Sequence, residues 1–171
     1  MKRLEVRPLS GADRPWVLDF LRKEWGSTTQ AYGGRLHSVD RHQGFVALQG
    51  DRPVGLLTYR IRRRDWEIST LKSVVEGAGV GSALIGAAKD AAAAAGRRCL
   101  VAFSTNDNRR ALRFYEKRGF SVVAVHRGAV DDARRRLKPK IPLLGNDGIR
   151  IRDEIELELV LGEGRRAMGE S

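Results

Sequence analysis

The sequence predicts a mixed α/β fold in which an antiparallel meander is joined to a parallel βαβ unit. Three strand-like segments with short connections occupy residues 44–71, and strands connected in this way pair antiparallel. A helical segment then separates the strand at residues 66–71 from an apolar strand at residues 98–103, and such a crossover makes its two strands parallel neighbours. With the flanking segments, about seven strands and four helices are expected.

The first part of the chain is expected to supply a strand, a helix, a loop and the meander. The elements expected in order are a strand at 4–9, a helix that begins after residues 10–13 and ends at 25–28, a loop with at most a short helix up to residue 42, and strands at 44–48 and 54–61. Turns at 49–53 and 62–65 connect the meander strands.

Residues 66–96 organise the rest of the fold. The strand at 66–71 leads into three alternating glycines between residues 77 and 81, and a run of helix formers follows from 83 to 95 with Gly96 in a C-cap position. Glycines let a ligand approach the backbone, and the N–H groups of a helix start attract negative charge. The segment therefore predicts an anion site, with a phosphorylated cofactor as its ligand.

The second half of the chain is expected to continue as a single domain with a short tail. The elements expected after residue 103 are a helix capped by residues 104–107 and ended by Gly119, a strand at 120–125, a partly helical basic segment at 128–140, a structured Pro- and Gly-rich loop at 139–148 and a strand at 155–161. Residues 1–161 are expected to form one domain, and residues 162–171 a flexible C-terminal tail.

Composition narrows the function classes. The net charge is +11, but the arginine clusters are dispersed and no zinc-finger, stacking or helix-turn-helix pattern accompanies them, which argues against nucleic acid as a partner. No apolar run reaches membrane-spanning length, and a lone cysteine allows no disulfide, so a cytoplasmic location without membrane contact is expected. His37, His42 and His126 are scattered, and no metal site is predicted.

Two sequence blocks carry a family resemblance. Gly79 and Gly81 match the glycines of a motif written Gln or Arg, two variable residues, Gly, one variable residue, Gly or Ala. Asn108 precedes Tyr115 by seven residues, and a Gly-Phe pair follows at 119–120. Together the blocks cover about a third of the chain, and they resemble the GNAT superfamily of acetyl-CoA-dependent N-acetyltransferases. The order of the predicted elements fits that fold over nearly the whole chain.

The resemblance implies an acyltransferase that moves an acetyl group from acetyl-CoA to a primary amine by direct attack. Backbone N–H groups of the glycine turn would bind the pyrophosphate of the coenzyme, and the Leu71 N–H would polarise the thioester carbonyl. Asn108 would contact the pantetheine arm, and the Tyr115 hydroxyl would protonate the departing thiolate. The implied coenzyme-binding residues are Thr70, Leu71, Gly77, Ala78, Gly79, Val80, Gly81, Ser82, Asn108 and Tyr115.

Glu76 departs from the family motif, because it stands where Gln or Arg is usual. An acidic side chain beside a pyrophosphate is repulsive, so Glu76 is expected to point away from the ligand.

The base that takes the proton of the amine is expected on the central strand. Side chains alternate along a strand, so Asp65 and Glu67 are predicted to share a face with Ser69 and Leu71. Glu67, which lies deeper in the strand, is the predicted base, acting directly or through water. A structural ion pair between Glu67 and an arginine is an equally weighted alternative.

Several alternatives stay open at the level of sequence. A dinucleotide-binding enzyme is disfavoured because the glycine spacing does not fit that fingerprint. A non-catalytic acyl-CoA-binding or RNA-associated module on the same fold is the alternative function. The acceptor amine can be a small amine, an antibiotic, an amino acid, a peptide or a protein lysine. The loop at 139–148 is expected to form either a wall of the acceptor site or a homodimer contact.

Overall fold

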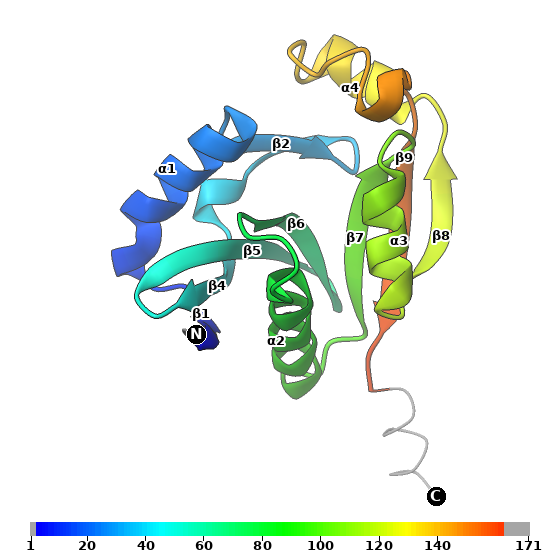
Figure 1. Cartoon of the computed structure of the whole chain (residues 1–171). Coiled ribbons are helices and arrows are strands. Elements are labelled where there is room, and N and C mark those ends of the chain that lie inside the picture. Colours follow the sequence, from blue (N-terminus) through cyan, green and yellow to red (C-terminus); the bar gives the residue numbers. More distant parts are fainter. Residues whose placement is uncertain (1–2, 163–171) are drawn as a thin grey trace, which may run out of the picture. The chain divides into compact units, whose positions relative to one another are not determined.

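The computed structural model describes residues 3–162 and has the predicted mixed α/β fold (Figure 1). Within these residues, four α-helices accompany seven sheet strands and a two-stranded ribbon. Residues 3–28, 38–100 and 160–162 form one compact unit, and residues 29–37 and 101–159 form a second. That residues 1–161 are a single domain stays a prediction. The predicted tail, except Gly162, lies outside the described residues.

The first unit contains the predicted antiparallel meander. Its strands run in the order β1 (Leu4–Pro8), β4 (Gln43–Gln49), β5 (Arg52–Arg62) and β6 (Asp65–Ser73), each antiparallel to its neighbour. The three meander strands extend beyond their expected bounds at both ends. β7 (Cys99–Thr105) follows β6 in strand order, and its first two residues still belong to this unit.

Two helices cover opposite faces of this sheet. α1 (Arg14–Trp25) packs on Leu56 of β5 in a buried cluster, whereas a Cβ added to the preceding Gly55 would lie 2.5 Å from Val80 Cγ1 of α2 (Val80–Ala94). Successive residues of a strand point to opposite faces, so α1 and α2 lie on the two sides (Figure 1). A short 3-10 turn, η1 (Gly11–Asp13), precedes α1.

The second unit holds the other sheet strands. β7, β9 (Glu154–Val160) and β8 (Ser121–His126) follow in that order, and β8 is antiparallel to β9. The helices of this unit are α3 (Arg109–Lys117) and α4 (Ala129–Arg136), and α4 confirms the predicted partly helical basic segment.

The cap of α3 differs from the prediction. Asn108 is the N-cap, and its Oδ1 accepts a hydrogen bond from the Ala111 N–H at 3.1 Å. The predicted capping residues lie too early, because Thr105 still belongs to β7 and Asp107 is buried. Several polar residues that favour caps stand in succession at this point, and the path of the chain out of the strand decides which of them caps.

Residues 27–42 do not form the expected loop. β2 (Thr29–Tyr32) and β3 (Arg35–Ser38) make a two-stranded ribbon, and a 3-10 helix, η2 (Val39–Arg41), follows it. The Gly-Gly pair between the strands adopts positive φ angles of 60° and 76°, the conformation that a tight two-residue hairpin needs. The prediction of a loop was wrong because the Gly-Gly turn pairs two short strands whose polar residues give no strand pattern in the sequence.

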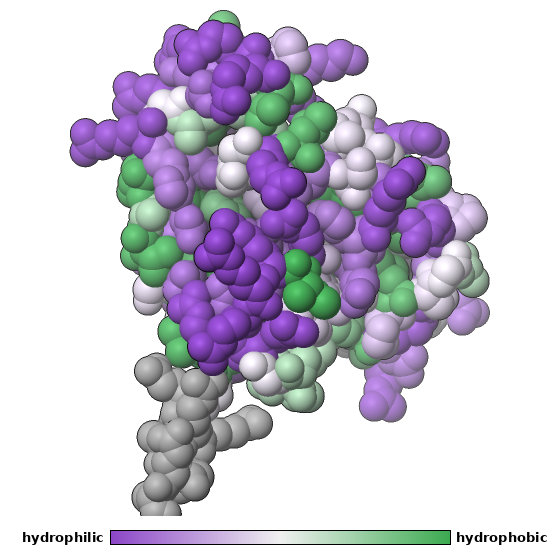
Figure 2. All heavy atoms as spheres, turned by 180° about the vertical axis from the view of Figure 1, so that it is seen from behind, coloured by the Kyte–Doolittle hydropathy of each residue, from purple (hydrophilic) through white to green (hydrophobic). Residues whose placement is uncertain are grey.

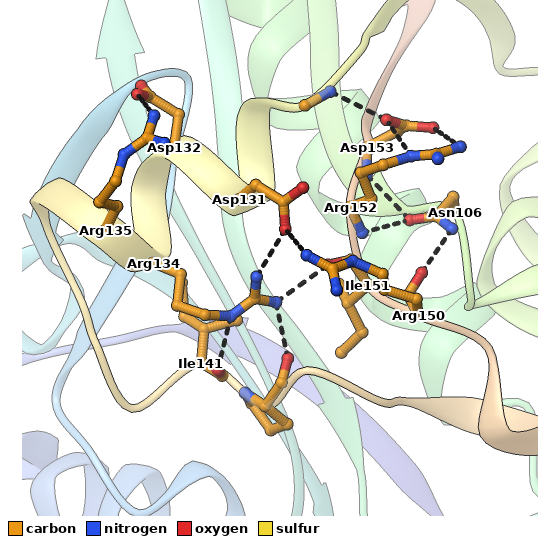
Figure 3. Close-up of polar contacts among 12 residues, drawn as sticks. Asn106, Asp131, Asp132, Arg134, Arg135, Ile141, Arg150, Ile151, Arg152 and Asp153 are labelled. Carbon is orange, nitrogen blue, oxygen red and sulfur yellow. Dashed lines mark hydrogen bonds and ion pairs between the residues drawn. The ribbon is translucent and has the colours of Figure 1, made fainter.

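The loop at residues 139–148 is structured, as predicted. The guanidinium of Arg134 donates to two carbonyl oxygens of the loop, at 2.9 and 2.7 Å (Figure 3). The carboxylate of buried Asp107 accepts from the backbone and side-chain nitrogens of Asn146, both at 3.0 Å. Asn146 begins a short 3-10 turn, η3 (Asn146–Gly148). Both proposed roles of the loop, acceptor-site wall or dimer contact, stay predictions.

The longest basic run of the sequence is partly neutralised by acidic residues of its own helix. Arg134 pairs with Asp131 at 2.8 Å and Arg135 with Asp132 at 3.1 Å (Figure 3). Hydrophilic side chains, purple in Figure 2, cover much of the face shown there, with hydrophobic ones interspersed. Both pairs lower the local positive charge, and the exposed one, Arg135 with Asp132, contributes little to stability.

Substitution of Gly55 tests the packing of α2 on β5. We expect Gly55→Ala to lower the free energy of unfolding by about 1–3 kcal/mol, because the new methyl group meets Val80 and neighbouring backbone. Gly86→Ala is the matched control, since nothing outside its own helix lies within 4 Å, and it should raise stability by about 0.5–1 kcal/mol. Urea denaturation measures both. Equal stability of the two variants would contradict this packing.

Candidate functional site

The glycine turn after β6 forms the first part of the candidate site. Gly77 and Gly79 have φ angles of 72° and 71°, in the left-handed region that costs other residues about 1–2 kcal/mol. No described heavy atom lies within 4 Å of a Cβ placed on either glycine, so the backbone of the turn is open to a ligand. Gly79 is the N-cap of α2, and the helix therefore begins at Val80 and not at the predicted residue 83.

The start of α2 has the polarity that an anion requires. The first N–H groups of a helix have no acceptor within the helix, and they lie at the positive end of its dipole. α2 is fifteen residues long and carries no acidic residue in its first turn. Glu76, just before the turn, is exposed to solvent. That Glu76 points away from a bound pyrophosphate stays a prediction.

A β-bulge interrupts β6 four residues before its end. Thr58 of β5 pairs with Thr70, but the next residue of β5, Tyr59, pairs with Ile68, so Ser69 has no residue opposite. An extra residue of this kind re-aims the side chains around it and bends the strand. Bulges are frequent next to active sites.

The bulge corrects the predicted alternation of β6. Leu71 lies opposite Leu57, whereas Thr70 lies opposite Thr58 and shares its face. The prediction that Leu71 shares a face with Glu67 was therefore wrong, because one extra residue inverts the alternation beyond it. Thr70, and not Leu71, shares the face of Glu67.

The polar side chains around the bulge are linked by a continuous chain of hydrogen bonds. Thr58 Oγ1 lies 2.6 Å from Thr70 Oγ1 and 2.7 Å from Ser69 Oγ, and Ser69 Oγ lies 2.7 Å from His42 Nδ1. Thr58 and Thr70 are 0% and 5% exposed, whereas Ser69 and His42 are half-buried. The chain thus runs from the interior of the sheet toward its surface.

Glu67 is held in an ion pair. Its two carboxylate oxygens accept from Arg60 Nε at 3.2 Å and from Arg62 Nη1 at 3.0 Å, and the residue is 2% exposed. The geometry has the features of the alternative that the sequence left open, a structural pairing with arginine. The role of Glu67 as a base stays a prediction.

Asn108 and Tyr115 belong to the second compact unit and are described by themselves. The Asn108 side chain caps α3, so its oxygen already accepts one backbone hydrogen bond. Tyr115 is 7% exposed and packs edge-to-face against Phe114 and Phe120. Burial raises the pKa of the Tyr115 phenol above its usual value of 10.0, so the hydroxyl keeps its proton and can act as a donor.

Sequence reasoning missed three members of the polar chain. His42 directly precedes β4, Thr58 lies on β5 and Ser69 lies on β6, and no spacing rule links them. The sequence signal was the hydroxyl pair Ser69-Thr70 between Ile68 and Leu71, which marks a polar position within the strand but does not identify its partners.

Two further observations concern metals and membranes. Among residues 3–162, no group of three or more His, Cys, Asp and Glu side chains has an arrangement that could hold a metal ion. No helix in the same range combines the length and the apolar character needed to cross a membrane.

Comparisons with known proteins agree with the fold. The family model described as "Acetyltransferase (GNAT) family" matches residues 12–120. The uncharacterised protein YdhI of Bacillus subtilis is 39% identical over 146 residues, which are 85% of this chain and 91% of YdhI.

Solved structures share the architecture at lower identity. The IAA acetyltransferase of Bacillus cereus matches with a TM-score of 0.72 at 21% identity, over 93% of this chain and all of that one. A GNAT family acetyltransferase of Elizabethkingia anophelis, solved with acetyl-CoA bound, has a TM-score of 0.69 at 16% identity, over 92% and 98% of the two chains.

The buried phenol of Tyr115 predicts a loss of stability at alkaline pH. Because its pKa is higher in the folded state, its contribution is complete below the unfolded pKa of about 10 and is lost as pH rises above that value. We expect the wild type to lose up to about 1.4 kcal/mol more per pH unit above pH 10 than Tyr115→Phe does. Urea denaturation between pH 8 and 11 measures the difference. Parallel curves for the two proteins would show that the phenol ionises equally in both states.

Proposed function

Because the chain belongs to the acetyltransferase (GNAT) family, we propose that it transfers an acetyl group from acetyl-CoA to a primary amine. Membership of the family supports acyl transfer as the reaction class. Acetyl-CoA as the acyl donor and a primary amine as the acceptor are what we propose. The observation that carries the proposal is the open glycine turn at the start of α2. Its backbone N–H groups and the helix dipole suit a pyrophosphate, and coenzyme A contains one.

The thioester arm is proposed to lie along β6 at the bulge. Backbone groups of Thr70 and Leu71 would hold the pantetheine, and the Leu71 N–H would donate to the oxyanion that forms during attack. The bulge directly precedes these two residues, and it leaves Ser69 outside the regular ladder with β5. A preorganised N–H donor of this kind contributes about 2.7–4 kcal/mol to catalysis in other acyl-transfer enzymes.

The reaction needs little covalent help from the protein. A neutral amine attacks the thioester carbonyl, the tetrahedral intermediate collapses, and the sulfur leaves as a thiolate. Tyr115 is proposed to protonate that thiolate, which requires a phenol that still carries its proton, and the raised pKa supports this. Asn108 is proposed to contact the pantetheine with the part of its amide that does not cap α3.

Glu67 is poorly placed to act as the general base. Both of its oxygens accept from guanidinium groups, and only 2% of the residue is exposed, so an incoming amine has little access to it. We therefore assign to Glu67 the alternative role, holding Arg60 and Arg62 against the strand.

A variant of the glycine turn tests where the coenzyme binds. We expect Gly79→Ala to weaken acetyl-CoA binding by about 10- to 100-fold, the effect of losing one hydrogen bond to a charged group worth about 1.5–3 kcal/mol. Gly96→Ala is the matched control. Gly96 lies beyond the other end of α2 with a φ of 72°, and nothing described lies within 4 Å of its Cβ, so the backbone strain is the same. Isothermal titration calorimetry measures the affinities.

Two outcomes of that titration would count against the proposal. No heat with the wild-type protein would exclude acetyl-CoA as the donor. Equal affinity of both variants and the wild type would show that the pyrophosphate binds elsewhere.

Tyr115→Phe tests the proposed proton donor. We expect acetyl-CoA affinity to be retained and kcat to fall by about 10²- to 10⁴-fold, the usual worth of a general acid. Thiol release from acetyl-CoA is followed over an amine panel that contains a polyamine, an aminoglycoside, free amino acids and a peptide with a free α-amino group. An unchanged kcat would remove Tyr115 from the mechanism. If no amine supports thiol release although acetyl-CoA binds, the chain is a non-catalytic coenzyme-binding module.

A further inference from the structure

We propose that Ser69 and His42 accept the proton of the attacking amine, with Thr58 and Thr70 fixing the Ser69 hydroxyl. The inference rests on the proposed function, because it concerns the same acetyl transfer. It is carried by the bulge in β6, which turns Ser69 and Thr70 toward the same hydroxyl of β5 and leaves His42 at the outer end of the hydrogen-bonded chain.

The hydrogen bonds of this chain can run in either of two opposite directions, and proton transfer to His42 needs the direction that ends at its Nδ1. Each hydroxyl has one proton to donate and two lone pairs to accept. In that direction Thr70 donates to Thr58, Thr58 donates to Ser69, and Ser69 donates to His42 Nδ1, so each of the three hydrogen bonds has one donor and one acceptor. Ser69 Oγ then keeps one lone pair, which can accept the N–H of a substrate amine. His42 must be the tautomer that carries its proton on Nε2.

The solvent exposure of the four hydrogen-bonded side chains indicates which of them can contact the substrate. Thr58 and Thr70 are buried, whereas Ser69 and His42 are half-buried, so an amine can approach Ser69. Ser69 directly precedes Thr70 and Leu71, at which we place the thioester arm. His42 lies 27 residues away in sequence, between η2 and β4, and reaches Ser69 from the neighbouring part of the first unit.

The proton transfer balances. An ammonium substrate first loses one proton to solvent. As the neutral nitrogen bonds to the acetyl carbon, the carbonyl electron pair moves to oxygen, the amine proton passes to Ser69 Oγ, and the Ser69 proton passes to His42 Nδ1. When the C–S bond breaks, its electron pair leaves on sulfur, which takes the Tyr115 proton. Imidazolium then releases a proton to solvent and the tyrosinate regains one.

His42→Asn separates a proton acceptor from a structural partner. The Asn oxygen can still accept the Ser69 hydrogen bond, but it cannot take up a proton at neutral pH. With the best amine of the panel, we expect kcat to fall by about 10²- to 10⁴-fold while acetyl-CoA affinity stays within about twofold. His42→Ala should recover part of its rate on addition of imidazole. His126→Asn is the control. His126 lies on β8 and pairs with Glu156 of β9, away from the hydrogen-bonded chain that links His42 to Ser69. The kcat of this variant should equal that of the wild type.

Ser69→Ala tests whether the two residues act as one path. We expect the double variant Ser69→Ala/His42→Asn to lose no more activity than either single variant, because each one interrupts the same transfer. Losses that multiply would overturn the shared path. So would a wild-type rate in His42→Asn, which leaves His42 a structural role only.

A spectroscopic readout is independent of the acceptor. In the ¹⁵N spectrum of the histidine side chains, the signal lost in His42→Asn should show an unprotonated Nδ1 and a protonated Nε2. A protonated Nδ1 would reverse the chain and overturn the inference. Absence of acetyl-CoA binding or turnover in the wild type would instead contradict the proposed function, so the two failures are distinguishable.

Discussion

The irregular pairing of β5 with β6 is the constraint on which the candidate site depends. One unpaired residue, Ser69, inverts the alternation of β6. It turns Leu71 to the side of Leu57 and brings Ser69 and Thr70 to the same threonine of β5. The strand then runs directly into the glycine turn and α2. A regular ladder would place neither the hydroxyls nor the end of the strand where they are.

The polar side chains buried between β5 and β6 are hydrogen-bonded, which offsets the cost of removing them from water. Thr58, Glu67 and Thr70 are nearly inaccessible to water, and each has partners within 3.2 Å. An unpaired polar group in the same place would cost about 1–3 kcal/mol. Buried networks of this kind hold their members in one geometry, which is what a proton path and an oxyanion donor both require.

The expected elements agree best where local pattern and tertiary packing favour the same structure. The antiparallel meander is predictable from its bounded strand-like segments and short turns, and α2 from its long run of helix formers. The ribbon at β2 and β3 and the Asn108 cap were not, because short polar segments satisfy several turn and cap rules at once. The same holds for the candidate site. The glycine turn could be predicted because it matches a sequence motif, whereas His42 belongs to no motif.

The sequence by itself determined the fold class and the acetyltransferase family, and it predicted an anion site at the glycine turn, because the helix formers and the spacing of the glycines, Asn108 and Tyr115 can be read along the chain alone. Only the tertiary structure decided that Glu67 forms ion pairs with two arginines and that the side chain of His42 is hydrogen-bonded to Ser69. The physical reason is that hydrogen-bond partners and strand register depend on the neighbouring strand, and one inserted residue changes both without leaving a signal in the local pattern.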